Sequence, residues 1–80
     1  MKITILFFGV TRDITAIRQL PLEVQPGTST LDVRTLLAQR YSGLDEGLNY
    51  AMAVNEKIGA HAVELNEGDI VAIIPPVSGG

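Results

Sequence analysis

The two most apolar runs of this chain lie near its two ends, and they restrict the fold more than any other feature. Residues 3–7 read Ile-Thr-Ile-Leu-Phe, and residues 70–74 read Ile-Val-Ala-Ile-Ile. Such runs are typical of strands in the middle of a sheet, where both faces are at least partly covered. We therefore expect the two segments to be neighbouring strands. Because nearly the whole chain separates them, a crossover over a helix would make them parallel.

The first segment alternates like a strand. Ile3, Ile5 and Phe7 fall on one face and are expected in the core, whereas Leu6 and Phe8 fall on the other with Lys2 and Thr4. The stretch at residues 1–9 is too short for a membrane span, which takes about 20 apolar residues. A polar stretch at residues 11–13 predicts a turn, and residues 20–25 predict a second strand, so the two strands are expected to pair as a hairpin.

A helix is predicted after Pro26 and Gly27. Ser29 and Asp32 have the spacing of a capping box, in which each side chain bonds the backbone of the other residue. An apolar stripe then recurs at helical spacing and is expected to pack on the sheet, and the helix is expected to stop at Gly43. The stripe consists of Val33, Leu36, Leu37 and Tyr41.

The remaining chain predicts further strands. Residues 50–54 and 70–74 are strand-like, with a turn at Asn55-Glu56, a short apolar patch around Ile58 and an extended segment at 62–65. The order of elements predicts an α+β fold, a ubiquitin-like β-grasp with a mixed sheet and one main helix on one face. We expect the domain to span residues 1–74 and a flexible, extended C-terminal tail to span 75–80.

Composition excludes several classes of function. The 80 residues suffice for one domain and contain no Cys, so disulfides, Cys-based zinc sites and thiol catalysis are absent and a reducing cytoplasm fits best. Nine acidic and six scattered basic residues give a net charge of −3, which speaks against nucleic acid and weakly favours a partner with a basic surface. We expect no membrane partner.

The tail carries the most specific chemistry. Pro75 and Pro76 cannot donate to a strand ladder and stiffen the exit of the chain, while Gly79 and Gly80 have no side chain and could be threaded into a narrow channel. Acylation onto AMP would activate the terminal carboxylate, and a sulfur nucleophile could then displace the nucleotide to leave a thiocarboxylate. Since the chain has no Gly-rich Lys loop and no cluster of metal ligands, another protein must supply this activation from ATP.

The C-terminal sequence resembles a known family. Residues 68–80, Gly-Asp-Ile-Val-Ala-Ile-Ile-Pro-Pro-Val-Ser-Gly-Gly, are similar to the C-terminal signature of the small, sulfur-carrying subunits of molybdopterin synthase. Leu6-Phe7-Phe8, Val54-Asn55 and Glu67-Gly68-Asp69 follow the order and rough spacing of that family. Ile73-Ile74 stands where many members have Phe or Leu.

This resemblance implies a role for the tail. Gly80 would be adenylated by an E1-like activating and sulfurating enzyme, become a thiocarboxylate and donate sulfur to cyclic pyranopterin monophosphate. Gly79 and Gly80 would be functional, and Pro75, Pro76, Val77 and Ser78 would position the end in the active site of the large catalytic subunit, in a heterotetramer. The chain itself would be a non-catalytic carrier that binds no cofactor, ATP being used by the activating enzyme.

A docking patch is predicted at Phe8, Ile58 and Ile74. Phe8 and Ile74 both fall on the face opposite the core residues of the two central strands. The resemblance implies a hydrophobic contact with the large subunit at these three positions. The alternative is that they pack under the late loops.

Other interpretations stay open. A thiamin-type sulfur carrier, a ubiquitin-like protein modifier and an interaction domain with an inert tail all share some of these features. The only histidine, His61, is predicted to be a surface residue rather than a metal ligand or base. Asp45-Glu46 and the pair Glu67 and Asp69 lie in turn-like sequence and are not expected to act as acid-base catalysts.

Overall fold

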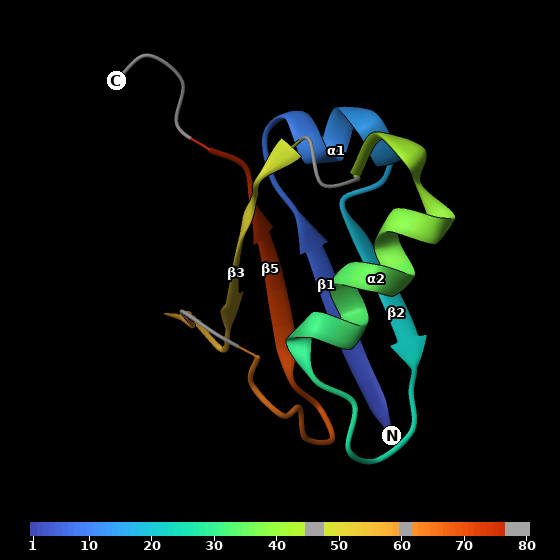
Figure 1. Ribbon diagram of the computed structural model, residues 1–80, viewed down its shortest axis with the longest axis vertical. Coiled ribbons are helices and arrows are strands. Elements are labelled where there is room, and N and C mark those ends of the chain that lie inside the picture. The colour runs from blue at the N-terminus through green and yellow to red at the C-terminus, as the bar shows by residue number, and fades with distance from the viewer. Residues whose placement is uncertain (45–47, 60–61, 77–80) are drawn as a thin grey trace.

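The structure, a computed structural model, describes residues 1–44, 48–59 and 62–76. These residues form one five-stranded sheet in the order β2-β1-β5-β3-β4, with two α-helices and a short 3-10 helix (Figure 1). In chain order the elements are β1 (Lys2–Phe7), α1 (Val10–Thr15), β2 (Gln19–Glu23), α2 (Thr30–Arg40), the 3-10 helix η1 (Ser42–Leu44), β3 (Ala51–Val54), β4 (Lys57–Ile58) and β5 (Ile70–Ile74). The predicted β-grasp fold is confirmed.

The first and last strands are parallel neighbours in the middle of the sheet, as predicted (Figure 1). Their register pairs Thr4 with Ile70 and Phe7 with Ile73, and Phe8 N–H continues the ladder by donating to the Ile73 carbonyl at 3.3 Å. The remaining strand pairs are antiparallel. Both central strands bury their alternate side chains on the same face, which fixes the core side of the sheet.

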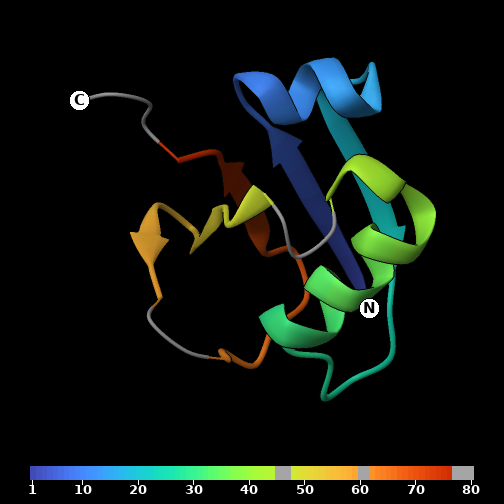
Figure 2. The ribbon, with the colours of Figure 1, turned by 45° about the horizontal axis from the view of Figure 1, so that its top comes forward.

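The connection between β1 and β2 differs from the prediction. The strands are antiparallel as expected, but helix α1 joins them and lies across one end of the sheet, so the predicted turn at 11–13 is wrong (Figure 2). The buried residues of α1 are Thr11 and Thr15, and its apolar Ile14 is only partly buried. The threonine hydroxyls donate to the Phe8 carbonyl at 2.6 Å and to the Thr11 carbonyl at 3.0 Å, which satisfies them away from water.

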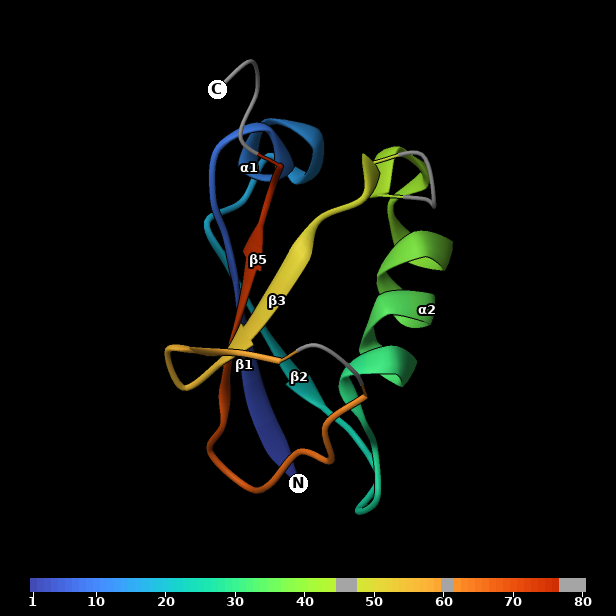
Figure 3. The same ribbon diagram turned by 60° about the vertical axis from the view of Figure 1, so that its left-hand side comes forward.

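Helix α2 covers one face of the sheet (Figure 3). The predicted capping box is present, because Ser29 Oγ accepts from Asp32 N–H and the Asp32 carboxylate accepts from Ser29 N–H. Val33 and Leu37 are buried, but Leu36 is 36 % exposed and does not belong to the buried stripe. Successive residues of an α-helix are about 100° apart around its axis, so residue 36 lies outside the contact that residue 37 makes with the sheet.

The predicted helix end at Gly43 is also wrong. Helix α2 ends at Arg40, Tyr41 is extended, and Gly43 lies in η1. A Cβ on Gly43 would lie 2.7 Å from Ile14 Cγ2, so the glycine permits close packing of η1 against α1 rather than ending a helix.

The later strands follow the prediction closely. A tight turn at Asn55-Glu56 joins β3 to the two-residue β4, and residues 62–65 run alongside the start of α2 through a bridge between Ser29 and Glu64. The core lies between α2 and the sheet. It consists of Ile3, Ile5, Phe7, Leu20, Val33, Leu37, Leu44, Tyr50, Met52, Leu65, Val71 and Ile73. Within the described residues, no helix is long and apolar enough to cross a membrane.

Candidate docking face and tail

The face of the sheet opposite α2 carries a row of apolar side chains. Strand register places side chains of four strands in one row on this face: Leu6 of β1 beside Ala72 of β5, Ala72 beside Ala53 of β3, and Ala53 beside Ile58 of β4. Directly paired residues share a face of the sheet. Because α2 packs on the other side, none of these side chains belongs to the core between the helix and the sheet (Figure 3).

The three predicted docking residues lie on this outer face. Phe8 is 49 % exposed and Ile58 is 69 % exposed, so the alternative that they pack under loops does not hold for these two. Ile74 is half-buried and pairs with Ala51 of β3. Exposed aromatic and branched aliphatic side chains gathered on one face are typical of a protein interaction surface.

A hollow of about 410 Å³ deepens the middle of the face. It is lined by Leu6, Phe8, Asn55, Glu56, Ile70 and Ala72. Of these residues only Phe8 was predicted as a docking residue. The alternation along the first strand predicts that Leu6 faces away from the core, and this was the sequence signal for apolar residues lining the hollow. The approach of the Asn55-Glu56 turn to β5 depends on the fold and could not be predicted in this way.

The tail leaves the domain beside the face of the sheet opposite α2, which we call the docking face. After Ile74 the chain reaches Pro75, which is half-buried against Gly9, and then Pro76, which is exposed. A Cβ on Gly9 would lie 3.0 Å from Pro75 Cγ, and Gly9 has a φ of +55°. Only glycine adopts this backbone without strain while leaving room for the proline ring. The predicted site residues Val77, Ser78, Gly79 and Gly80 lie outside the described residues.

The acidic residues weighed as catalysts have structural contacts where they are described. Glu67 Oε1 accepts from Lys2 N–H at 3.1 Å, and the buried Asp69 carboxylate accepts from Asn66 N–H at 2.7 Å. Asp45, Glu46 and His61 lie outside the described residues. Over the ranges 1–44, 48–59 and 62–76, no group of three or more His, Cys, Asp or Glu could hold a metal ion. The described residues therefore offer an apolar face with Pro75 and Pro76 beside it.

Comparison with known proteins decides the family. The model of the ThiS family matches residues 5–80. The chain belongs to the ThiS family. It is also 38 % identical, over 100 % of its own length and 99 % of the relative's, to the molybdopterin synthase sulfur carrier subunit of Mycobacterium tuberculosis. The resemblance predicted from the sequence is confirmed.

Solved structures share the fold of this ThiS-family chain. SAMP1 from Haloferax volcanii superposes with a TM-score of 0.85 at 19 % identity, with full coverage of both chains, which shows a common fold. A chain in the complex of subunits 1 and 2 of molybdopterin-converting factor from Helicobacter pylori superposes with a TM-score of 0.71 at 28 % identity, again with full coverage of both chains.

Proposed function

We propose that this chain is the sulfur carrier subunit of a molybdopterin synthase, and that its C-terminal Gly80 carries the sulfur as a thiocarboxylate. The observation that carries the proposal is the position of the tail: Pro75 leaves a central strand next to Phe8 and Ile74 on an exposed apolar face. A partner bound to that face lies where it can also receive the chain end. The full-length relationship to named sulfur carrier subunits supports the same assignment.

The partner on the docking face is the large catalytic subunit. The related subunit 1 of Helicobacter pylori was solved in a complex with subunit 2, and the docking face of the present chain offers the apolar surface that such a complex needs. Phe8, Ile58 and Ile74 provide the hydrophobic contact in this proposal. Pro75, Pro76, Val77 and Ser78 direct the end of the chain into the large subunit's active site.

The tail chemistry proceeds in two activation steps before transfer. A carboxylate oxygen of Gly80 attacks the α-phosphorus of ATP, and pyrophosphate leaves. Hydrosulfide supplied at the activating enzyme then attacks the acyl carbon of the adenylate, the C–O bond to AMP breaks, AMP leaves, and the thiocarboxylate forms with loss of a proton. The sulfur is delivered to cyclic pyranopterin monophosphate in the large subunit, while the chain itself acts in the cytoplasm as carrier and substrate rather than catalyst.

Glycine at the last two positions suits this chemistry for a steric reason. A Cβ would widen the chain end, whereas Gly79 and Gly80 let the extended backbone enter a narrow channel and bring the carboxylate to a nucleotide. Binding of the folded domain on its docking face raises the effective concentration of the tail at the reacting atoms.

Intact-mass spectrometry tests the proposal. The chain is incubated with ATP, the E1-like activating enzyme encoded in the same genome and a sulfur source, and we expect one carboxylate oxygen at Gly80 to be replaced by sulfur. A matched variant with one bulky residue added after Gly80 should stay unmodified. An unmodified wild-type chain, with an enzyme preparation active on another carrier, would contradict the proposal. Covalent conjugates with lysines of other proteins would instead support a modifier function.

A further inference from the structure

Glu56 occupies a backbone position that favours glycine. Asn55 and Glu56 are the two central residues of the β3–β4 hairpin, and their φ angles are 49° and 74°. Two-residue hairpin turns with both φ values positive have Asn-Gly as the preferred sequence, because glycine adopts positive φ without strain. Asn55 fits its position, whereas glutamate at residue 56 costs stability that glycine would not. A strained residue retained in a turn points to a role outside the turn.

The strained residue lies at the rim of the docking hollow. Glu56 and Asn55 line one side of the hollow, opposite a floor of Leu6, Ile70 and Ala72. The Asn55 side chain is already engaged, because it donates to Asp69 Oδ1 and accepts from Ile70 N–H. Glu56 is exposed, and no residue in the described part of the chain forms a hydrogen bond or ion pair with its carboxylate.

Among the described residues that line the hollow, Glu56 is the only ionised group. The neighbouring Lys57 pairs with Val54, whose side chain packs against the core, so Lys57 lies on the opposite side of the hairpin from the hollow. Lys2 and Glu23 also belong to the outer face, but they are register partners at the far end of β1 and β2, away from the hollow. The rim of the hollow is therefore acidic, in a chain whose net charge is −3.

We propose that Glu56 is a charged anchor of the docking face and pairs with a Lys or Arg of the partner, next to an apolar side chain that fills the hollow. This inference rests on the proposed function and specifies the partner's chemistry at that site. A cation beside the apolar contact complements the Glu56 carboxylate and selects against partner surfaces that place an acid there. The strain at residue 56 is the stability cost of keeping that carboxylate in place.

Two substitutions separate the binding role from the turn. Glu56→Gln keeps a side chain at positive φ and removes only the charge, whereas Glu56→Gly removes both the charge and the strain. Affinity for the large subunit encoded in the same genome is measured by titration calorimetry at low and high salt. We expect both variants to raise Kd by about threefold to tenfold at low salt and to flatten its salt dependence.

The two variants are expected to differ in thermal stability. We expect Glu56→Gly to raise Tm by about 4 °C, because the turn loses its strain, and Glu56→Gln to leave Tm unchanged. Glu23→Gln, which removes an exposed carboxylate of the same face away from the hollow, is the matched control and should bind like wild type. Loss of binding together with a gain in Tm is a combination that a purely structural role would not produce.

The outcomes distinguish this inference from the function on which it rests. If wild type binds the large subunit and both Glu56 variants bind with the same Kd and salt dependence, Glu56 is not an anchor and the inference is wrong. An unchanged Tm in Glu56→Gly would show that residue 56 is not strained, and this result would contradict the inference as well. If wild type itself does not bind the large subunit, the proposed partner is wrong, and the proposed role of Glu56 is wrong as well.

Discussion

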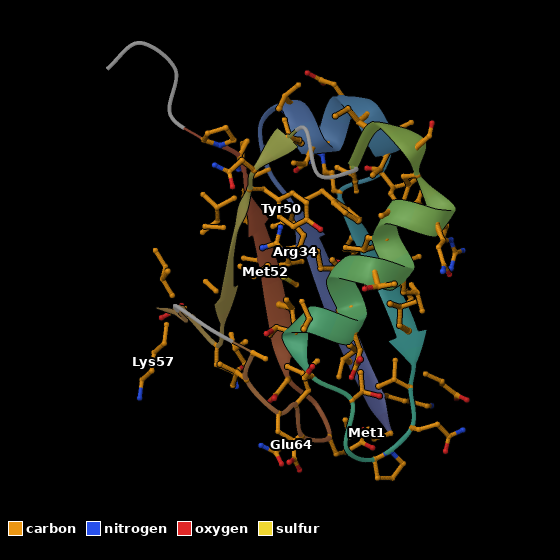
Figure 4. The ribbon with its side chains drawn as sticks, viewed as in Figure 1. Met1, Arg34, Tyr50, Met52, Lys57 and Glu64 are labelled. Carbon is orange, nitrogen blue, oxygen red and sulfur yellow. The ribbon has the colours of Figure 1, made fainter. Side chains whose placement is uncertain are left out.

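The guanidinium carbon of Arg34 lies 4.3 Å from the centroid of the Tyr50 ring, and Arg34 Nη2 donates to the Tyr50 carbonyl at 3.0 Å (Figure 4). One side chain of α2 thus holds both the ring and the backbone of the residue that leads into β3. Ala51, the next residue, pairs with Ile74 at the end of β5. The contact therefore ties the helix to the part of the sheet from which the tail departs.

Tyr50 makes stability sensitive to alkaline pH. Desolvation by burial raises the pKa of Tyr50 above its usual value near 10, and the nearby Arg34 cation lowers it by less. Because the folded state holds this proton more tightly, its contribution is fully present below pH 10 and is lost as the pH rises through the raised pKa. We expect urea denaturation to show a smaller decline of stability above pH 10 in Tyr50→Phe than in wild type.

At neutral pH, Tyr50→Phe should be at least nearly as stable as wild type. The Tyr50 hydroxyl is buried, and no described residue hydrogen-bonds to it. Its removal should therefore either raise the free energy of unfolding or lower it by less than about 1 kcal/mol. Tyr41→Phe, at a partly exposed tyrosine, is the control for loss of a phenol as such. A loss of several kcal/mol in Tyr50→Phe at pH 7 would mean that the hydroxyl has a partner.

Gly9 and Pro75 are expected to be coupled. Gly9→Ala should destabilise the fold by about 2 kcal/mol, because it adds both backbone strain and contact with the proline ring. Gly27→Ala, at a φ of +93° with open space around it, should cost only about 1 kcal/mol. In a double-mutant cycle by urea denaturation, Pro75→Ala should recover about 0.5–1 kcal/mol in the Gly9→Ala background. Strict additivity would show that the ring contact is unimportant.

The docking face should tolerate charge in the monomer but not in the complex. Phe8→Asp and Ile58→Asp change exposed side chains, so each should leave the thermal midpoint within a few degrees of wild type while weakening binding of the large subunit at least about tenfold. Leu31→Asp is the matched control, since Leu31 is 58 % exposed on α2 away from this face. Equal binding by all three variants would place the interface elsewhere.

Asn55 should contribute to stability through contacts distant in sequence. Its side chain donates to Asp69 Oδ1 at 2.9 Å and accepts from Ile70 N–H at 3.0 Å. Asn55→Ala should therefore lower the free energy of unfolding by about 1–3 kcal/mol in urea. Asn49→Ala, which makes the same change at another positive φ, controls for the backbone preference of asparagine. A similar loss in both variants would assign the effect to the backbone alone.

Local patterns in the sequence predicted most of the fold. The alternation at Ile3, Ile5 and Phe7 determined the buried face of β1, and the spacing of Ser29 and Asp32 located the start of α2. Both features act between residues at most four positions apart, so the sequence contains all the information needed. The parallel pairing of the end strands followed from their hydrophobicity and their separation.

The errors occurred where distant contacts decide the structure. Helix α1 has only six residues, and its buried residues are threonines. The sequence therefore has no apolar residues at helical spacing that would predict this helix. Gly43 is small because Ile14 packs against it, a contact that no local pattern contains. The outer-face positions of Phe8, Ile58 and Ile74 could be predicted from alternation and family resemblance, and their docking role stays a prediction. The contribution of Glu56 to the hollow depends on how the hairpin meets β5.

The central position of β5 has a consequence for synthesis of the protein on the ribosome. Until residues 70–74 have emerged, β1 and β3 have no strand between them, so the sheet cannot close. The strand that completes the sheet directly precedes the prolines of the tail, and we expect folding to wait until this strand has left the ribosome. Products truncated before β5 would therefore lack a stable domain, and proteases would remove them before they could occupy a partner unproductively.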